Sequence, residues 1–425
     1  MKKILGFAAV AAMGLASTSA LASKARILAL GDEVEDNYFI EDSRSIFTNA
    51  AYVNDYSDTL MLEWGGNGAF TILDQNDNAK AMGGFLKKSG NFTYGIYLGN
   101  ESNVSSFLRI VASPDSPSAA NLQSTYLATA DNQTDFFVGS TMSNGIKWGW
   151  NFLWTSDKNE ANTAANSKDS AMATRFGLLG SNWEGFVNLS LNSESEKKNL
   201  TTPTKFDGKL GFLLGGSYKL DSGVKLHAAY KTFKWEQTGG NQTAGVKTDG
   251  SFTRYFIGAG KVHKLSETDS VFFRAVYDAL NVELKYASGK AELDRKALPL
   301  VAGYEVNATS WLTLRGSVSY HLLGNAESKN LATVVGSEQS TNPGAANFGL
   351  KGLALASYDG STTDGKKSIA NSTSVNAGAS LLFGNLTVDG FIGTTAASRA
   401  ATTQSKQGVL ALDNLMTRVG MTYKF

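Results

Sequence analysis

The 425-residue sequence has no cysteine, only five prolines and only three histidines. Without cysteine there is no disulfide, no thiolate nucleophile and no cysteine-based metal site. Few prolines leave the backbone donors that long strands need. Ser319 stands two residues before His321, but nothing marks a third catalytic residue. We therefore expect no enzyme and no cofactor or metal site.

The chain also lacks a large charge surplus and a long apolar run. The formal net charge of +1 gives no basic excess for binding nucleic acid. The mean hydropathy is -0.17, and beyond the N-terminus no run approaches the roughly 18 apolar residues of a spanning helix. Glycine (44 residues) and aromatic residues (11%) are plentiful. This composition favours extended strands over helices.

The first 22 residues have the pattern of a secretory signal peptide. Lys2 and Lys3 precede a short apolar core at 4–15, and Ala20-Leu21-Ala22 provides a cleavage site between small residues. We expect export and a mature protein that begins at Ser23.

Beyond residue 58 the sequence alternates with a period of two. In the last run, Leu415, Val419, Met421, Tyr423 and Phe425 fall on one face. Most runs have about nine to thirteen residues, near the length of a tilted membrane-spanning strand. The predicted strands are 59–73, 79–87, 91–99, 134–142, 145–155, 170–180, 182–192, 208–220, 223–235, 251–263, 269–281, 294–306, 310–323, 373–383, 385–395 and 413–425.

Connections between these runs alternate between short and long. The short ones carry the Gly, Asn, Asp and Ser of tight turns. The long ones are 100–133, 156–169, 193–207, 236–250, 282–293, 324–372 and 396–412. Short periplasmic turns and long outer loops are typical of bacterial barrels. The pattern predicts an all-β fold, a closed antiparallel transmembrane β-barrel over 59–425, with sixteen strands or, alternatively, fourteen.

Residues 23–58 are acidic, with three basic and eight acidic side chains. Two interpretations stay open: a solvated periplasmic segment, or a plug that enters the barrel and contacts basic lumen residues. Apolar residues such as Ile27, Phe39 and Ile46 argue against a merely disordered tail.

Charged residues recur on the polar faces of the strands and are candidates to line a pore. They could simply solvate a wet lumen, or they could form a cation-rich wall that favours anionic solutes. The candidates are Lys147, Arg175, Lys209, Lys225, Lys231, Arg254, Arg274, Glu305, Arg315 and Arg418.

Two segments carry resemblances to known proteins. The terminal Tyr423-Lys424-Phe425 resembles the assembly signal of outer-membrane barrels, which implies recognition by the barrel-assembly machinery. Ala29-Leu30-Gly31, followed by the acidic-Ser segment 41–51, resembles the start of FadL-like and PorV-like barrels. Ala50 stands where that family has proline, and the family usually has fourteen strands. This resemblance implies transport of hydrophobic substrates.

From these features we expect a porin-like barrel in the Gram-negative outer membrane, passing small hydrophilic solutes by passive diffusion. A FadL-like transporter of hydrophobic substrates is the alternative, favoured by apolar lumen-face residues such as Leu213, Leu382 and Phe391. A barrel for surface adhesion or envelope structure is the second alternative. The expected partners are outer-membrane lipid and small solutes, with assembly into a homo-oligomer as an open alternative. We also expect loop 100–133 to fold inward or over the mouth and narrow the pore, or alternatively to form a short extra strand at 105–111, and loop 324–372 to stay external and mobile.

Overall fold

The computed structural model describes residues 23–32, 37–65, 80–100, 133–160, 166–197, 204–238, 247–286, 289–329, 365–368, 373–394 and 415–425. The predicted signal peptide and the interiors of loops 100–133 and 324–372 lie outside the described residues. The expectations about those segments therefore stay predictions.

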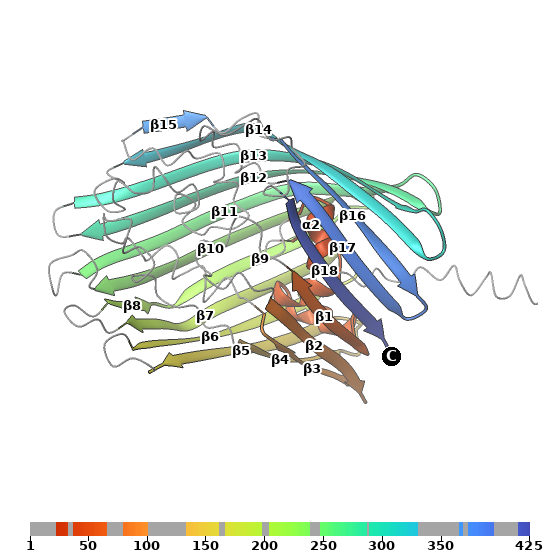
Figure 1. The fold of residues 1–425 in the computed structure, drawn as a ribbon, viewed down its shortest axis with the longest axis horizontal. Coiled ribbons are helices and arrows are strands. Elements are labelled where there is room, and N and C mark those ends of the chain that lie inside the picture. Colours follow the sequence, from red (N-terminus) through yellow and green to blue (C-terminus); the bar gives the residue numbers. More distant parts are fainter. Residues whose placement is uncertain are drawn as a thin grey trace, which may run out of the picture.

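Strands dominate the described chain (Figure 1). The first half contains β1 (Thr59–Gly65), β2 (Lys80–Ser89), β3 (Phe92–Leu98), β4 (Thr134–Thr141), β5 (Lys147–Asn159), β6 (Ser167–Leu179), β7 (Trp183–Lys197), β8 (Thr204–Gly208) and β9 (Gly211–Lys219). The second half contains β10 (Lys225–Thr238), β11 (Lys247–Lys264), β12 (Asp269–Tyr286), β13 (Gly289–Asn307), β14 (Leu312–Lys329), β15 (Gly365–Ser368), β16 (Thr373–Phe383), β17 (Leu386–Thr394) and β18 (Leu415–Lys424).

The sheet closes on itself, because β1 pairs antiparallel with both β2 and β18. Two short strands add no ring position of their own. β8 and β9 both pair with β7 and β10, and β15 pairs with the end of β14 beyond its partner β16. The described strands therefore form a ring of sixteen positions, and the predicted closed barrel is confirmed. Closure leaves no unpaired edge, as a sheet in lipid requires.

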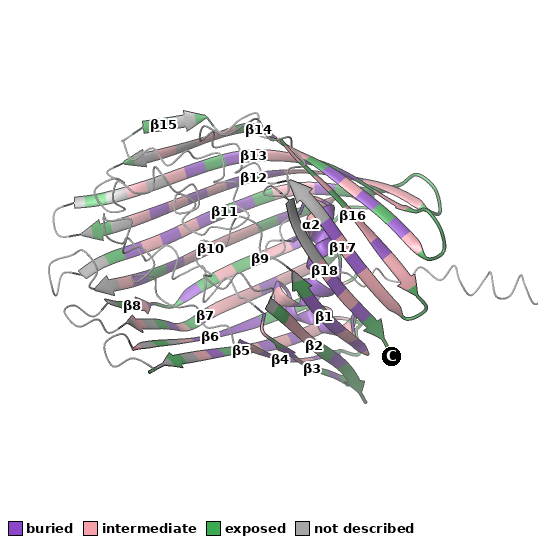
Figure 2. Cartoon of the chain, in the orientation of Figure 1, coloured by how far each residue is buried: buried purple, intermediate pink, exposed green. Residues whose placement is uncertain are grey.

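Residues alternate between the two faces of the wall, as Figure 2 shows along the strands. On β11, Phe252, Arg254 and Phe256 are buried, whereas Tyr255 and Ile257 are exposed. The outer face carries large apolar side chains around the ring: Leu62, Trp64, Phe85, Phe136, Trp154, Phe176, Leu214, Tyr277, Leu314, Val318 and Tyr423. This apolar belt is the surface that an outer-membrane barrel presents to lipid.

None of the helices in the described part of the chain is long and apolar enough to cross a membrane.

Several strands run further into the predicted long connections than the sequence suggested. The prediction of a loop at 282–293 is wrong, because β12 continues to Tyr286 and β13 begins at Gly289. Cross-strand ion pairs hold this extension: Lys290 of β13 contacts Glu283 of β12, and Lys329 of β14 contacts Glu292 of β13. Opposite charges on paired strands stabilise a ladder in water as well as in lipid, so polarity alone does not mark a loop.

Residues 23–32 and 37–58, called here the inner segment, lie within the ring (Figure 1). They contain the α-helix α2 (Lys24–Ala29) and the 3₁₀ helices η1 (Ser43–Phe47) and η2 (Ala50–Asn54). α2 contacts β14, β16, β17 and β18, and η2 contacts β3 to β6. Tyr38 and Phe39 pack with residues of β7, β11 and β12. Because these strands surround the barrel axis, the inner segment crosses the lumen.

Candidate functional site

The wall is shaped to receive the inner segment, because glycines stand where its backbone approaches most closely. A Cβ on Gly149 would lie 2.1 Å from the carbonyl oxygen of Ala50. One on Gly177 would overlap the side chain of Asn49, and one on Gly378 would lie 2.6 Å from the Cβ of Ala29. Any larger residue at these positions would push the segment from the wall.

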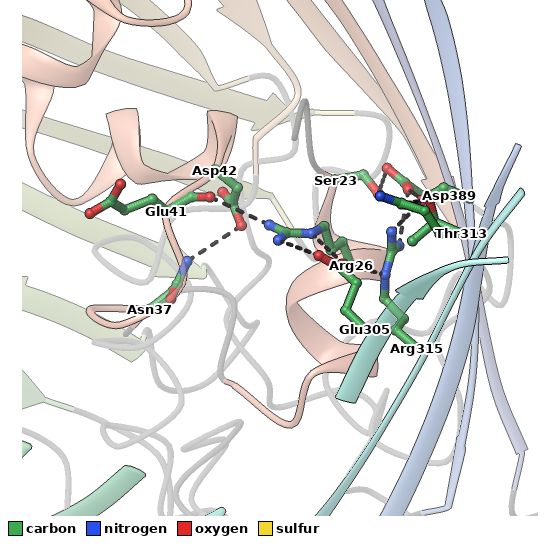
Figure 3. A network of polar contacts seen from close by, with 11 residues as sticks. Ser23, Arg26, Asn37, Glu41, Asp42, Glu305, Thr313, Arg315 and Asp389 are labelled. Carbon is green, nitrogen blue, oxygen red and sulfur yellow. Dashed lines mark hydrogen bonds and ion pairs between the residues drawn. The ribbon is translucent and has the colours of Figure 1, made fainter. Parts of the chain in front are cut away.

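The first half of the inner segment is tied to the wall by a network of charged groups (Figure 3). Arg26 donates to both carboxylate oxygens of Glu305, at 3.0 and 3.2 Å. Arg315 donates to the same Glu305 at 2.9 Å and to Asp389 at 3.2 Å. The hydroxyl of Ser23 donates to Asp389 at 3.0 Å. Two guanidinium groups and two carboxylates thus join α2 to β13, β14 and β17.

A second network joins η1 to β1 and β3. The Arg44 guanidinium lies 3.1 Å from the Glu63 carboxylate, and the Tyr97 hydroxyl donates to the same carboxylate at 2.9 Å. Arg44 also donates to Asn100 at 2.7 Å and stacks on the Phe47 ring, 4.0 Å from its centroid. Its charge is therefore compensated although the side chain is only 4% exposed.

Asp42 caps η1 from a fully buried position. Its carboxylate accepts a hydrogen bond from the Arg44 amide at 2.6 Å and one from the Asn37 side chain at 3.4 Å. Burial raises the pKa of Asp42 from its ordinary value of 3.8 to about 7, although the nearby Arg26 acts in the opposite direction. The inner segment therefore contains a carboxyl group that titrates near neutral pH.

Aromatic rings mediate the contact of the inner segment with β7, β10 and β11. Tyr38 stacks on the His227 imidazole with a centroid separation of 3.9 Å and an interplanar angle of 15°. Phe186 and Phe256 pack around the same pair. Beside it lies a small cavity with room for about one water molecule, lined by Asn37, Tyr38, Ile40, Glu41, Ser45, Thr48, Asn49, Tyr52, Glu184, Phe186 and Lys225.

Most of the candidate pore-lining residues lie on the inner face, but the described carboxylates neutralise many of them. Arg274 pairs with Asp32, and Lys147 pairs with Asp55, both in the inner segment. The wall itself pairs four more cations with its own carboxylates: Arg175 with Asp135, Lys225 with Glu184, Arg254 with Asp278, and Arg315 with Asp389 and Glu305. Their part in transport stays a prediction.

Three other candidates lie elsewhere or are incompletely described. Lys209 stands between β8 and β9, is 43% exposed and pairs with Asp207 and Glu236. Lys231 lies on β10, where it is half-buried. Arg418 is paired in register with Gly65 and Phe391, but the placement of its side chain lies outside the described features.

The sequence reasoning missed the acidic residues that balance these cations. Asp135, Asp278 and Asp389 are at most 5% exposed and face the lumen beside arginines one or two strands away. The available signal was their polar-face position within otherwise apolar strands, as for Asp389 in β17. The described lumen therefore does not present a cation-rich wall that would select anions.

No protein-family model matches the chain, and no curated protein matches it. Among solved structures, the chain is similar to the Pseudomonas putida toluene transporter TodX, with 12% identity, coverage of 94% of this chain and 96% of that chain, and a TM-score of 0.35. It is also similar to a Pseudomonas aeruginosa FadL homologue, with 11% identity, coverage of 92% and 96%, and a TM-score of 0.40. For the Ralstonia pickettii toluene transporter TbuX the values are 12% identity, 90% and 93% coverage, and a TM-score of 0.32.

Proposed function

We propose that this barrel transports small hydrophobic or amphipathic molecules across the outer membrane, and that the inner segment acts as its plug. The observation that carries the proposal is the position of the inner segment, which touches wall strands on all sides of the lumen. A general diffusion pore needs a continuous aqueous channel. A lumen crossed by a folded segment instead favours controlled passage, so the alternative of the sequence analysis fits better than a passive porin.

Apolar side chains of the inner wall support a hydrophobic substrate. Phe233 on β10 stacks on Phe252 of β11, with centroids 4.8 Å apart and an interplanar angle of 14°. Trp235 packs beside Phe233 at 5.6 Å. On the neighbouring strand, Leu280 and Val282 are buried on the same inner face. Wide porins line their channels with polar groups, whereas this stretch offers rings on which an apolar molecule can pack.

The charge pattern of the lumen supports the same substrate class. A cation paired with a carboxylate at hydrogen-bond distance exerts little field at a distance, because the two charges largely cancel. The described wall thus provides no strong attraction for a free ion, and an uncharged or weakly charged molecule meets no electrostatic barrier.

Reconstitution of the folded protein in liposomes and planar bilayers tests this proposal. We compare the intact mature chain with a variant that lacks residues 23–58. The intact chain should admit a hydrophobic aromatic probe, exclude a disaccharide and show little ion conductance. The deletion variant should conduct ions and admit the disaccharide. Steady large conductance and disaccharide entry through the intact, heat-modifiable barrel would contradict the proposal.

A further inference from the structure

His227 is a wall histidine that stacks directly on the inner segment. It is 3% exposed and lies among four aromatic rings. Tyr38 and Phe39 come from the inner segment, Phe186 from β7 and Phe256 from β11. The imidazole therefore forms part of the surface against which the plug closes.

A chain of hydrogen bonds holds the other side of the imidazole. The Ser217 hydroxyl donates to the Glu184 carboxylate at 2.6 Å, and Ser217 Oγ lies 2.7 Å from His227 Nδ1. Glu184 is ion-paired with Lys225 at 2.8 Å, which marks it as an ionised acceptor. A hydroxyl has a single proton, so Nδ1 must donate to Ser217. Titration of the ring then takes place at Nε2.

Charging this ring disfavours the closed packing. Desolvation of a buried cation costs more than the surrounding aromatic faces return through cation–π attraction. Lys225 adds a positive charge on the same strand, and Arg254 on β11 lies 5.5 Å from the Phe256 ring centroid. The facing acids are Glu184 on β7 and Asp278 on β12, each already paired with a cation. The titratable groups that the inner segment contributes on this side are Tyr38, Glu41 and Tyr52, which all line the adjoining cavity.

The cavity beside the stack has room for about one water molecule. It is bounded by Tyr38 and Asn49 of the inner segment and by Glu184, Phe186 and Lys225 of the wall. Movement of Tyr38 and Phe39 away from the wall would enlarge this space and let water reach the imidazolium.

We propose that His227 is a proton-operated latch: protonation releases the edge of the inner segment at Tyr38 and Phe39 and opens a passage along β7, β10 and β11. This inference rests on the proposed function and names its regulation. Histidine is the side chain whose ordinary titration range lies closest to such a switch.

The first test measures entry of the hydrophobic probe into liposomes between pH 5.5 and 7.5. We expect flux through the intact chain to rise about tenfold on acidification. His227→Phe, which keeps an aromatic ring but cannot be charged, should lose this rise. Asp42→Asn serves as the background for all comparisons, because Asp42 is a group of the inner segment that also titrates in this range.

The second test introduces a pair of cysteines into the cysteine-free chain, so that a disulfide can hold the latch closed. A Cβ on Gly260 would lie 3.3 Å from Cγ of Phe39, so the pair Phe39→Cys/Gly260→Cys is placed to form a disulfide across the latch. The control is Phe39→Cys alone, which removes the same ring but cannot form the disulfide. Oxidation should abolish acid activation only in the latch pair, and a reductant should restore it.

The outcomes separate the latch from the transport function. Acid activation that persists in His227→Phe, or that oxidation abolishes equally in the single-cysteine control, overturns the latch. If the probe crosses the variant lacking residues 23–58 but flux through the intact chain does not change with pH, the latch proposal is wrong and the transport proposal stands. If the probe crosses neither protein although both are folded, the transport proposal itself fails.

Discussion

Replacing Gly149 by alanine should partly dislodge the inner segment. The added Cβ would lie 2.1 Å from the Ala50 oxygen, 2.3 Å from the Ala50 carbonyl carbon and 2.5 Å from the Ala51 nitrogen. These are backbone atoms of η2, so no side-chain rotation relieves the overlap. To reach the 3.0 Å that real Cβ contacts respect, η2 must move by about 0.9 Å.

Overpacking of this kind costs about 1–3 kcal/mol. Since 1.4 kcal/mol is a tenfold change in an equilibrium constant, the released population should rise about five- to 150-fold. Planar-bilayer conductance and disaccharide entry measure that population, and heat-modifiable gel migration checks that the barrel is folded. Gly185→Ala is the matched control, because its Cβ would meet nothing within 4 Å. A folded Gly149→Ala barrel that is as tight as Gly185→Ala would refute the packing argument.

Three further outcomes follow from the charges. Arg315→Ala removes a 3%-exposed cation that contacts Glu305 and Asp389, and should destabilise the barrel by about 3–5 kcal/mol, seen as a lower temperature of gel-mobility transition. Lys87→Ala breaks a surface ion pair with Asp58, in which the lysine side chain is 59% exposed. This variant should lower the stability of the barrel by no more than about 1 kcal/mol. Because the pKa of Asp42 is raised, its stabilisation of the closed segment is complete below pH 3.8 and is lost as the pH rises through about 7. Protease access to the segment should therefore increase as the pH rises through about 7, and Asp42→Asn should remove this increase.

The strands could be predicted because each carries its own signal. Alternation in 310–323 predicted that Leu314 and Val318 face one way and Arg315 and Ser317 the other, and the exposures in β14 follow that division. A period of two is a local property of extended backbone, so no knowledge of the partner strand was needed. The tight turns were equally local: Gly145 and Gly384 have positive φ, which glycine adopts without strain.

The occupied lumen could not be predicted in the same way, because its contacts are set by register and closure. Asp389 lies 74 residues from Arg315, and Glu305 lies 279 residues from Arg26. Their pairing depends on which strands become neighbours and on how far each is staggered. The sequence showed an acidic segment ahead of a mildly basic barrel, but not which carboxylate meets which guanidinium.

The two kinds of contact around the inner segment have different physical consequences. Buried ion pairs such as Arg26–Glu305 return little net stability, because desolvation offsets their attraction, but they tolerate almost no displacement. They therefore fix where α2 sits. The rings around Tyr38 and His227 lose contact area gradually and can repack against another apolar molecule. A segment positioned by ions on one side and packed by rings on another can yield to a hydrophobic substrate at the rings while it remains attached to the wall.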